Sequence, residues 1–141
     1  MPANTKRVFL DATYLIALAT PRDQHHVVAR RLMEEVLARR VRMLTTRAVL
    51  LEVANSLAQP KTRPAVVSAL EDCERDPLIE IIPFSEELYA KAFALYRERP
   101  DKSWGLTDCA SFIVMGERGI AEALTADEHF AQAGFTALLD R

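Results

Sequence analysis

The sequence predicts an α/β domain, a three-layer α/β/α sandwich around a parallel sheet of four to five strands. Short apolar runs alternate with longer segments of helical periodicity, which is typical of parallel sheets covered by helices. With 141 residues, 50% of them hydrophobic and 27% charged, the chain has the size and composition of a globular protein. No Gly/Ser/Pro-rich linker divides it, so we expect residues 1–141 to form a single domain.

The expected elements follow from apolar runs and from residues that begin or end helices. Strands are expected at residues 8–11, 41–45, 78–82, 121–124 and 136–139. Helices are expected at residues 12–19, 24–40, 47–59, 63–75, 86–96, 108–117 and 127–131. Four polar residues are expected to cap the helices that follow them, namely Asp23, Thr46, Ser85 and Thr107. Pro21 and Gly119 are expected to end helices.

Charge and cysteine content narrow the functional class. The net charge is −2, but residues 1–70 hold 11 Lys/Arg against 5 Asp/Glu, whereas residues 71–141 hold 7 against 15. The basic half could contact phosphates, or it could be a solvated surface with ion pairs along helices. Cys73 and Cys109 lie far apart with no CxxC spacing, which argues against a structural zinc site. Two such thiols suggest a reducing compartment, and we expect a cytoplasmic protein.

Four acidic residues lie at the ends of predicted strands or in the helices beside them, where they could form one site. Asp11 ends the first strand, and Asp127 lies just beyond the fourth. Asp108 belongs to the first turn of a helix, and Glu52 lies inside an apolar helical run. Each has an ordinary explanation on its own, as a helix cap, a favourable charge at a helix N-terminus or a charge on a helix face. Together, however, they would gather at the carboxyl edge of the sheet, where an ion such as Mg²⁺ or Mn²⁺ would relieve their repulsion.

The stretches around these acids resemble the motifs of PIN domains. They are Phe9-Leu10-Asp11-Ala12-Thr13-Tyr14-Leu15-Ile16-Ala17-Leu18, Leu51-Glu52-Val53-Ala54-Asn55, Trp104-Gly105-Leu106-Thr107-Asp108-Cys109-Ala110-Ser111-Phe112 and Leu124-Thr125-Ala126-Asp127-Glu128-His129-Phe130, with Gly134-Phe135. The resemblance spans essentially the whole chain, and all four motifs occur in order. Size and motifs are most similar to VapC-type toxins of prokaryotic toxin–antitoxin pairs.

This resemblance implies a metal-dependent endoribonuclease that cleaves RNA phosphodiester bonds with metal-activated water. Asp11, Glu52, Asp108 and Asp127 would be the catalytic metal ligands for Mg²⁺ or Mn²⁺, with Asp11 and Asp108 holding the ion most directly. The resemblance also implies a VapB-type antitoxin that blocks the cleft with an Arg or Lys side chain. A homodimer is expected from the resemblance and from the apolar surface of the long N-terminal helices.

Two alternatives within the family stay open. The chain could be a PIN-domain nuclease outside any toxin–antitoxin pair, or a non-catalytic PIN-like module that binds RNA or protein. A phosphatase or receiver domain also carries an aspartate after its first strand. Such a phosphatase has a second aspartate two residues later, where this chain has Thr13, and the acidic pair and lysine of a receiver are absent.

Several neighbouring residues are candidates for supporting roles. Thr13 and Thr107 could orient the carboxylates through hydrogen bonds, or they could only cap helices. Ser103 could reach metal-bound water or substrate, or belong to a solvated loop. Trp104 could stack on a base, although a single tryptophan near an apolar run is more often core. His129 follows Asp127 on a predicted surface turn, and like the adjacent pair His25-His26 it is expected to lack a functional role more often than to have one.

Overall fold

Five parallel strands form the centre of the molecule in the computed structural model, which describes residues 6–139. The strands are β1 (Arg7–Leu10), β2 (Arg42–Thr46), β3 (Ile79–Ile82), β4 (Glu122–Leu124) and β5 (Thr136–Ala137). Their order is β3-β2-β1-β4-β5, and each neighbouring pair is parallel. The first strand therefore lies in the middle of the sheet, as expected for a strand whose last three residues, Val8 to Leu10, are apolar and buried.

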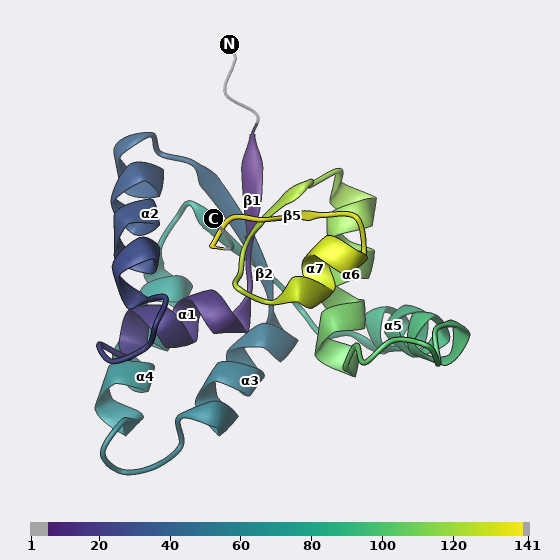
Figure 1. Cartoon of the computed structure of the whole chain (residues 1–141), viewed down its shortest axis with the longest axis horizontal. Coiled ribbons are helices and arrows are strands. Elements are labelled where there is room, and N and C mark those ends of the chain that lie inside the picture. Colours follow the sequence, from purple (N-terminus) through teal and green to yellow (C-terminus); the bar gives the residue numbers. More distant parts are fainter. Residues whose placement is uncertain (1–5, 140–141) are drawn as a thin grey trace.

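Helices cover both faces of this sheet (Figure 1). They are α1 (Ala12–Ala19), α2 (His26–Ala38), α3 (Arg47–Ser56), α4 (Arg63–Arg75), α5 (Glu86–Glu98), α6 (Leu106–Arg118) and α7 (Glu128–Gln132). Helices α1, α2 and α4 lie on one side of the sheet, and α5 and α6 on the other, so the predicted three-layer arrangement is confirmed. Between residues 6 and 139, no helix is long and apolar enough to cross a membrane.

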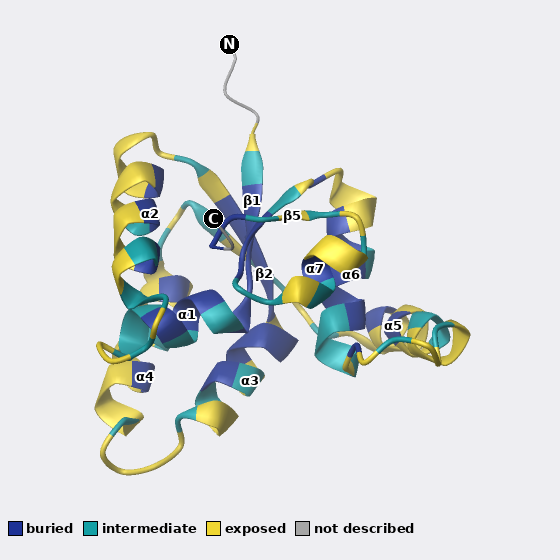
Figure 2. Cartoon of the chain, in the orientation of Figure 1, coloured by how far each residue is buried: buried dark blue, intermediate teal, exposed yellow. Residues whose placement is uncertain are grey.

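The core is built around β1 and its two neighbours. Phe9 pairs in register with Leu44 of β2 and with Ala123 of β4, and all three side chains are fully buried. Phe130 of α7 packs against Phe9, with ring centroids 6.3 Å apart, and thereby ties the short last helix to the central strand. Figure 2 shows the strands as the buried centre, with exposed residues on the outward faces of α2, α4 and α5.

Two of the four predicted helix caps, Thr46 and Ser85, are present. The side chains of Thr46 and Ser85 accept hydrogen bonds from the backbone amides three residues later, at 3.2 Å and 3.1 Å. Gly119 follows α6 in the left-handed conformation, with φ of 67°, which glycine adopts without the steric cost that other residues incur. Because the strands are parallel, the helices that Thr46 and Ser85 begin after β2 and β3 start at the carboxyl edge of the sheet.

Two predicted caps are wrong. Asp23 belongs to a turn in which its carboxylate accepts from the amide of His25 at 2.8 Å, so α2 begins only at His26. Thr107 lies inside the first turn of α6, whose cap is Gly105. The Asp108 carboxylate accepts a hydrogen bond from the Gly105 amide at 3.2 Å, and this contact starts the helix earlier than the threonine alone suggested.

Candidate active site

Asp11 and Asp127 lie at the same edge of the sheet because β1 and β4 are parallel neighbours. Asp11 follows β1, and its amide donates to the carbonyl of Leu124, the last residue of β4, at 3.1 Å. Each aspartate also caps a helix, since the Asp11 carboxylate accepts from Thr13 and the Asp127 carboxylate from His129. The predicted capping roles are therefore real, and they orient both carboxylates beyond the ends of the strands.

Two threonine hydroxyls hold the Asp11 carboxylate. Oδ2 of Asp11 accepts from the hydroxyl of Thr125 at 2.7 Å and from the hydroxyl of Thr13 at 2.9 Å. Each hydroxyl oxygen also accepts a hydrogen bond from a backbone amide. The amide of Ala126 donates to Thr13, and the amide of Asp127 donates to Thr125, both at 3.0 Å. These amides leave the hydroxyl protons available to the carboxylate. Burial raises the pKa of Asp11, which is only 2% exposed, while the two hydroxyls favour its ionised form.

Asp108 occupies the first turn of α6, at the positive end of the helix dipole. Its Oδ2 atom lies 3.0 Å from Nδ1 of His129. The same nitrogen atom lies 3.3 Å from Oδ1 of Asp127. One ligand atom from each of these three residues lies within 4.8 Å of the other two. Burial is the main cause that raises the pKa of Asp108.

Glu52 completes the acidic cluster, by which we mean Asp11, Glu52, Asp108 and Asp127. Burial in the middle of α3 and, to a smaller degree, the charges of the other three acids together raise its pKa to about 7. These charges act on Glu52 through space, whereas the ligand atoms that lie within 4.8 Å of one another, among the described residues, are those of Asp108, Asp127 and His129. A carboxyl group with a pKa near 7 is protonated in a substantial fraction of the molecules at neutral pH.

Of the residues predicted to support the acids, Thr13 contacts one of them directly, whereas Ser103 and Trp104 lie elsewhere. Thr13 bonds to Asp11, in the supporting position that was predicted for it. Thr107 accepts a hydrogen bond from Ser111 through its carbonyl, and it lines a shallow pocket together with Glu52. Ser103 lines a different hollow, between the loop before α6 and the end of α5. Trp104 is buried, so it belongs to the core rather than to an exposed stacking surface.

Sequence reasoning did not single out Thr125 and gave His129 little weight. Thr125 is fully buried and directly follows β4, so its position one residue beyond a strand was the available signal. His129 was expected on a surface turn. Its approach to Asp108 depends on how α7 packs beside α6, which its position in the chain does not reveal.

The donor set suits a divalent cation. Among the described residues, everything that acts on Glu52 raises its pKa, and the ion pairs of Asp108 and Asp127 are with the imidazole of His129 rather than with a lysine or arginine. Carboxylate oxygens are preferred ligands of Mg²⁺ and Mn²⁺. Asp108, Asp127 and His129 offer ligand atoms that lie within 4.8 Å of one another, and the charges of Asp11 and Glu52 lie near them.

Solved structures with the same fold include three that cover nearly the whole chain. VapC20 of Mycobacterium tuberculosis, described as a sarcin-ricin loop cleaving toxin, shares 24% identity at a TM-score of 0.80 and covers 92% of this chain and 96% of its own. VapBC2 of Rickettsia felis, bound to a DNA fragment from its promoter, shares 15% at a TM-score of 0.66 and covers 93% and 96%. FitAcB of Neisseria gonorrhoeae shares 20% at a TM-score of 0.60 and covers 92% and 94%.

The family model of the PIN domain matches residues 8–136. No curated protein matches the chain. The match runs from β1 to the start of β5, and so it includes every residue of the acidic cluster. Together with the parallel sheet and the acids at its carboxyl edge, this match shows that the chain belongs to the PIN-domain family.

Proposed function

We propose that the protein is a metal-dependent endoribonuclease. The observation that carries this proposal is the placement of four acids at one sheet edge, where the charges of Asp11, Asp108 and Asp127 raise the pKa of Glu52 and only the imidazole of His129, among the described residues, forms an ion pair with any of them. A purely structural role gives little reason to crowd acids in this way, because each unpaired buried charge destabilises the fold. We also propose a cytoplasmic location, since both cysteines are buried free thiols.

Each residue of the cluster would contribute differently to cleavage. A bound Mg²⁺ or Mn²⁺ supplies charge that polarises a phosphoryl oxygen and lowers the pKa of a water for in-line attack. Asp11 and Asp108 are the proposed main ligands, because the threonine hydroxyls hold one and the helix N-terminus holds the other. Glu52 and Asp127 would act partly through bound water, and Thr13 and Thr125 would keep the Asp11 carboxylate in place.

The direct test is RNA hydrolysis by the purified protein. A hairpin that carries the sarcin-ricin loop is one suitable substrate because VapC20 has the same fold, and an unrelated structured RNA is the comparison. Cleavage should require Mg²⁺ or Mn²⁺ and stop in EDTA. Cleavage that continues unchanged in EDTA, or a complete lack of cleavage on every RNA tested, would overturn this function.

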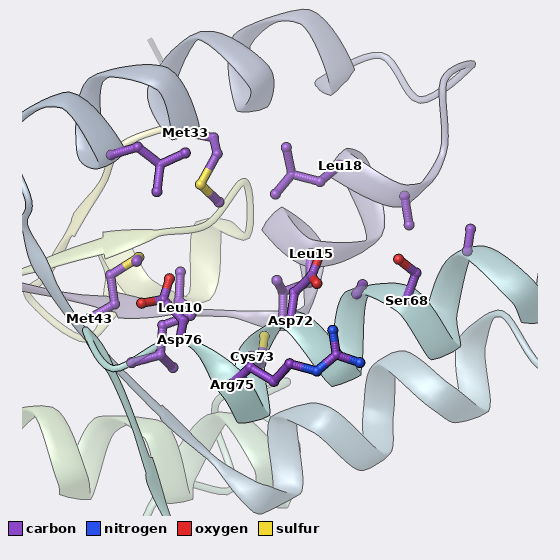
Figure 3. A pocket seen from close by; sticks show the side chains of 15 residues that line it. Leu10, Leu15, Leu18, Met33, Met43, Ser68, Asp72, Cys73, Arg75 and Asp76 are labelled. Carbon is purple, nitrogen blue, oxygen red and sulfur yellow. The ribbon is translucent and has the colours of Figure 1, made fainter.

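We further propose that the protein is the toxin of a toxin–antitoxin pair and binds a VapB-type antitoxin. An apolar groove between α1, α2 and α4 offers a docking surface (Figure 3). Leu18, Met33 and Leu37 line it, together with the acidic Asp72 and Asp76 and the basic Arg75. Two acids against one base leave the lining with a net negative charge, so the groove suits an apolar segment with basic residues, and a basic side chain elsewhere on the same partner would block the acidic cluster.

The homodimer remains a proposal, and the structure suggests a different surface for it than the N-terminal helices. The apolar surface expected on those helices includes the groove just described. A second apolar strip follows Phe84, Tyr89, Phe93 and Tyr96 along α5, with neighbouring ring centroids 6.0–6.4 Å apart. Phe84 shares a shallow pocket with Leu51 of α3. We propose that this aromatic strip packs against its copy in a two-fold dimer.

A PIN-domain nuclease that acts outside any toxin–antitoxin pair is the alternative. The acidic cluster supports the toxin and the independent nuclease equally, because RNA cleavage does not depend on a protein inhibitor. The groove favours the paired version. The reading frame beside the gene distinguishes them, since a toxin requires an antitoxin encoded there that binds this protein.

A further inference from the structure

We propose that Nδ1 of His129 is a metal ligand, so that the site binds a first-row transition ion such as Mn²⁺ in preference to Mg²⁺. This inference rests on the proposed metal-dependent function and assigns a role to a residue outside the four acids. It concerns the part of the site formed by Asp108, Asp127 and His129.

The start of α7 places the histidine ring beside the acids. Asp127 caps this helix, and its Oδ1 atom accepts the backbone amide of His129 at 2.9 Å. The same turn brings Nδ1 to 3.3 Å from Oδ1 of Asp127 and to 3.0 Å from Oδ2 of Asp108, on a different helix. The imidazole therefore meets two carboxylates from two elements through one nitrogen atom.

The three ligand atoms are close enough for one ion. They lie within 4.8 Å of one another, and a cation between them would contact two oxygens and one nitrogen. The side chains of His129, Asp108 and Asp127 are 22%, 13% and 25% exposed, so an ion can reach them from solvent. No other group of three such ligand atoms gathers in this way within residues 6–139.

The nitrogen changes which ion the site prefers. Mg²⁺ binds oxygen ligands and retains several waters, whereas imidazole is a good ligand for transition ions. A site of carboxylates alone would not gain this selectivity. The competing explanation is that His129 only positions Asp108 through a hydrogen bond. In that case its loss would weaken the binding of both ions to a similar degree.

The first experiment compares Mn²⁺ and Mg²⁺ binding by calorimetric titration of the full-length protein, of His129→Gln and of His25→Gln. His25 is a matched control because it lies before α2, outside the site. We expect His129→Gln to weaken Mn²⁺ binding at least about tenfold and Mg²⁺ binding much less. His25→Gln should bind both ions as the unaltered protein does. A parallel loss of both affinities, or no loss of either, would overturn the inference.

The second experiment detects the nitrogen directly. Pulsed electron paramagnetic resonance of the Mn²⁺-loaded protein should show coupling to a directly bound ¹⁴N nucleus, present in His25→Gln and absent in His129→Gln. Mn²⁺ that binds without this coupling contradicts the histidine ligand but leaves the acidic metal site intact. Failure of the unaltered protein to bind either ion would overturn both this inference and the proposed metal-dependent function.

Discussion

The hydroxyl of Thr125 donates a 2.7 Å hydrogen bond to the carboxylate of Asp11, 114 residues earlier in the chain. The bond joins the ends of β4 and β1, which are neighbours in the sheet. Because the acceptor is fully enclosed, the hydroxyl replaces water as the partner of the charge. The fold thus holds Asp11 in position before any substrate arrives.

This relationship predicts that Thr125→Val impairs catalysis without removing a carboxylate. The valine has nearly the same shape but cannot donate to Asp11, so the carboxylate becomes harder to ionise and less well oriented. RNA cleavage should fall about 10–100-fold, as measured by initial rates under saturating Mn²⁺. Thr125→Ser keeps the hydroxyl and should retain most of the activity. Equal rates for the valine and serine variants would contradict the proposed role.

Removing one of the acids should lower RNA cleavage more than removing the threonine hydroxyl does. Asp11→Asn and Asp108→Asn keep the size of the side chain but remove a charge that would hold the cation. We expect each to lower RNA cleavage by about 10²–10³-fold or more. Asp101→Asn is a matched control, because Asp101 is exposed and pairs with nearby Arg99 in the loop before α6. A folded Asp11→Asn protein that cleaves RNA at the original rate would rule out the mechanism.

Glu52 should make the stability of the metal-free protein depend on pH. Its pKa is about 7 in the folded protein against an ordinary value of 4.5, so the folded state holds the proton more tightly than the unfolded state. The free energy of unfolding should therefore decrease as pH rises from about 4.5 to about 7, and then level off. Denaturant titrations in EDTA should show this decrease to be smaller in Glu52→Gln. Parallel profiles of the two proteins would show that Glu52 does not carry the proton.

The aromatic strip on α5 should determine the oligomeric state. Phe93 is 40% exposed and stacks between Tyr89 and Tyr96, so a charge there would be buried against the second copy. We expect Phe93→Glu to be a monomer by light scattering at high micromolar concentration. Val27→Glu, on the exposed side of α2, should leave the dimer intact. A monomeric unaltered protein under these conditions would remove the proposal.

The apolar groove should be the binding surface of the proposed antitoxin. Leu37 lines the groove, whereas Val27 lies on the same helix outside it. Leu37→Glu should weaken co-purification with the product of the adjacent gene and leave RNA cleavage by the free protein unchanged. Val27→Glu should affect neither. Retention of a stable complex by Leu37→Glu would show that the partner, if it exists, binds elsewhere.

The positions of the strands and most of the helices could be predicted because their signals are local. Thr46 and Ser85 cap the helices that follow them, and Asp11 ends a strand and begins a helix in adjacent residues. The two cap errors arose where a second local contact competes. Asp23 closes a turn before α2, and Asp108 reaches back to the amide of Gly105.

The sequence by itself determined the alternation of elements, the apolar central strand and the four acids that the motifs single out. Only the tertiary structure decided which side chains meet those acids. Parallel pairing of β1 with β4 brings Thr125 to Asp11, and the packing of α7 beside α6 brings His129 to Asp108. Neither contact has a local signal, because a hydrogen bond between distant residues depends on how whole elements pack and not on the sequence around either residue.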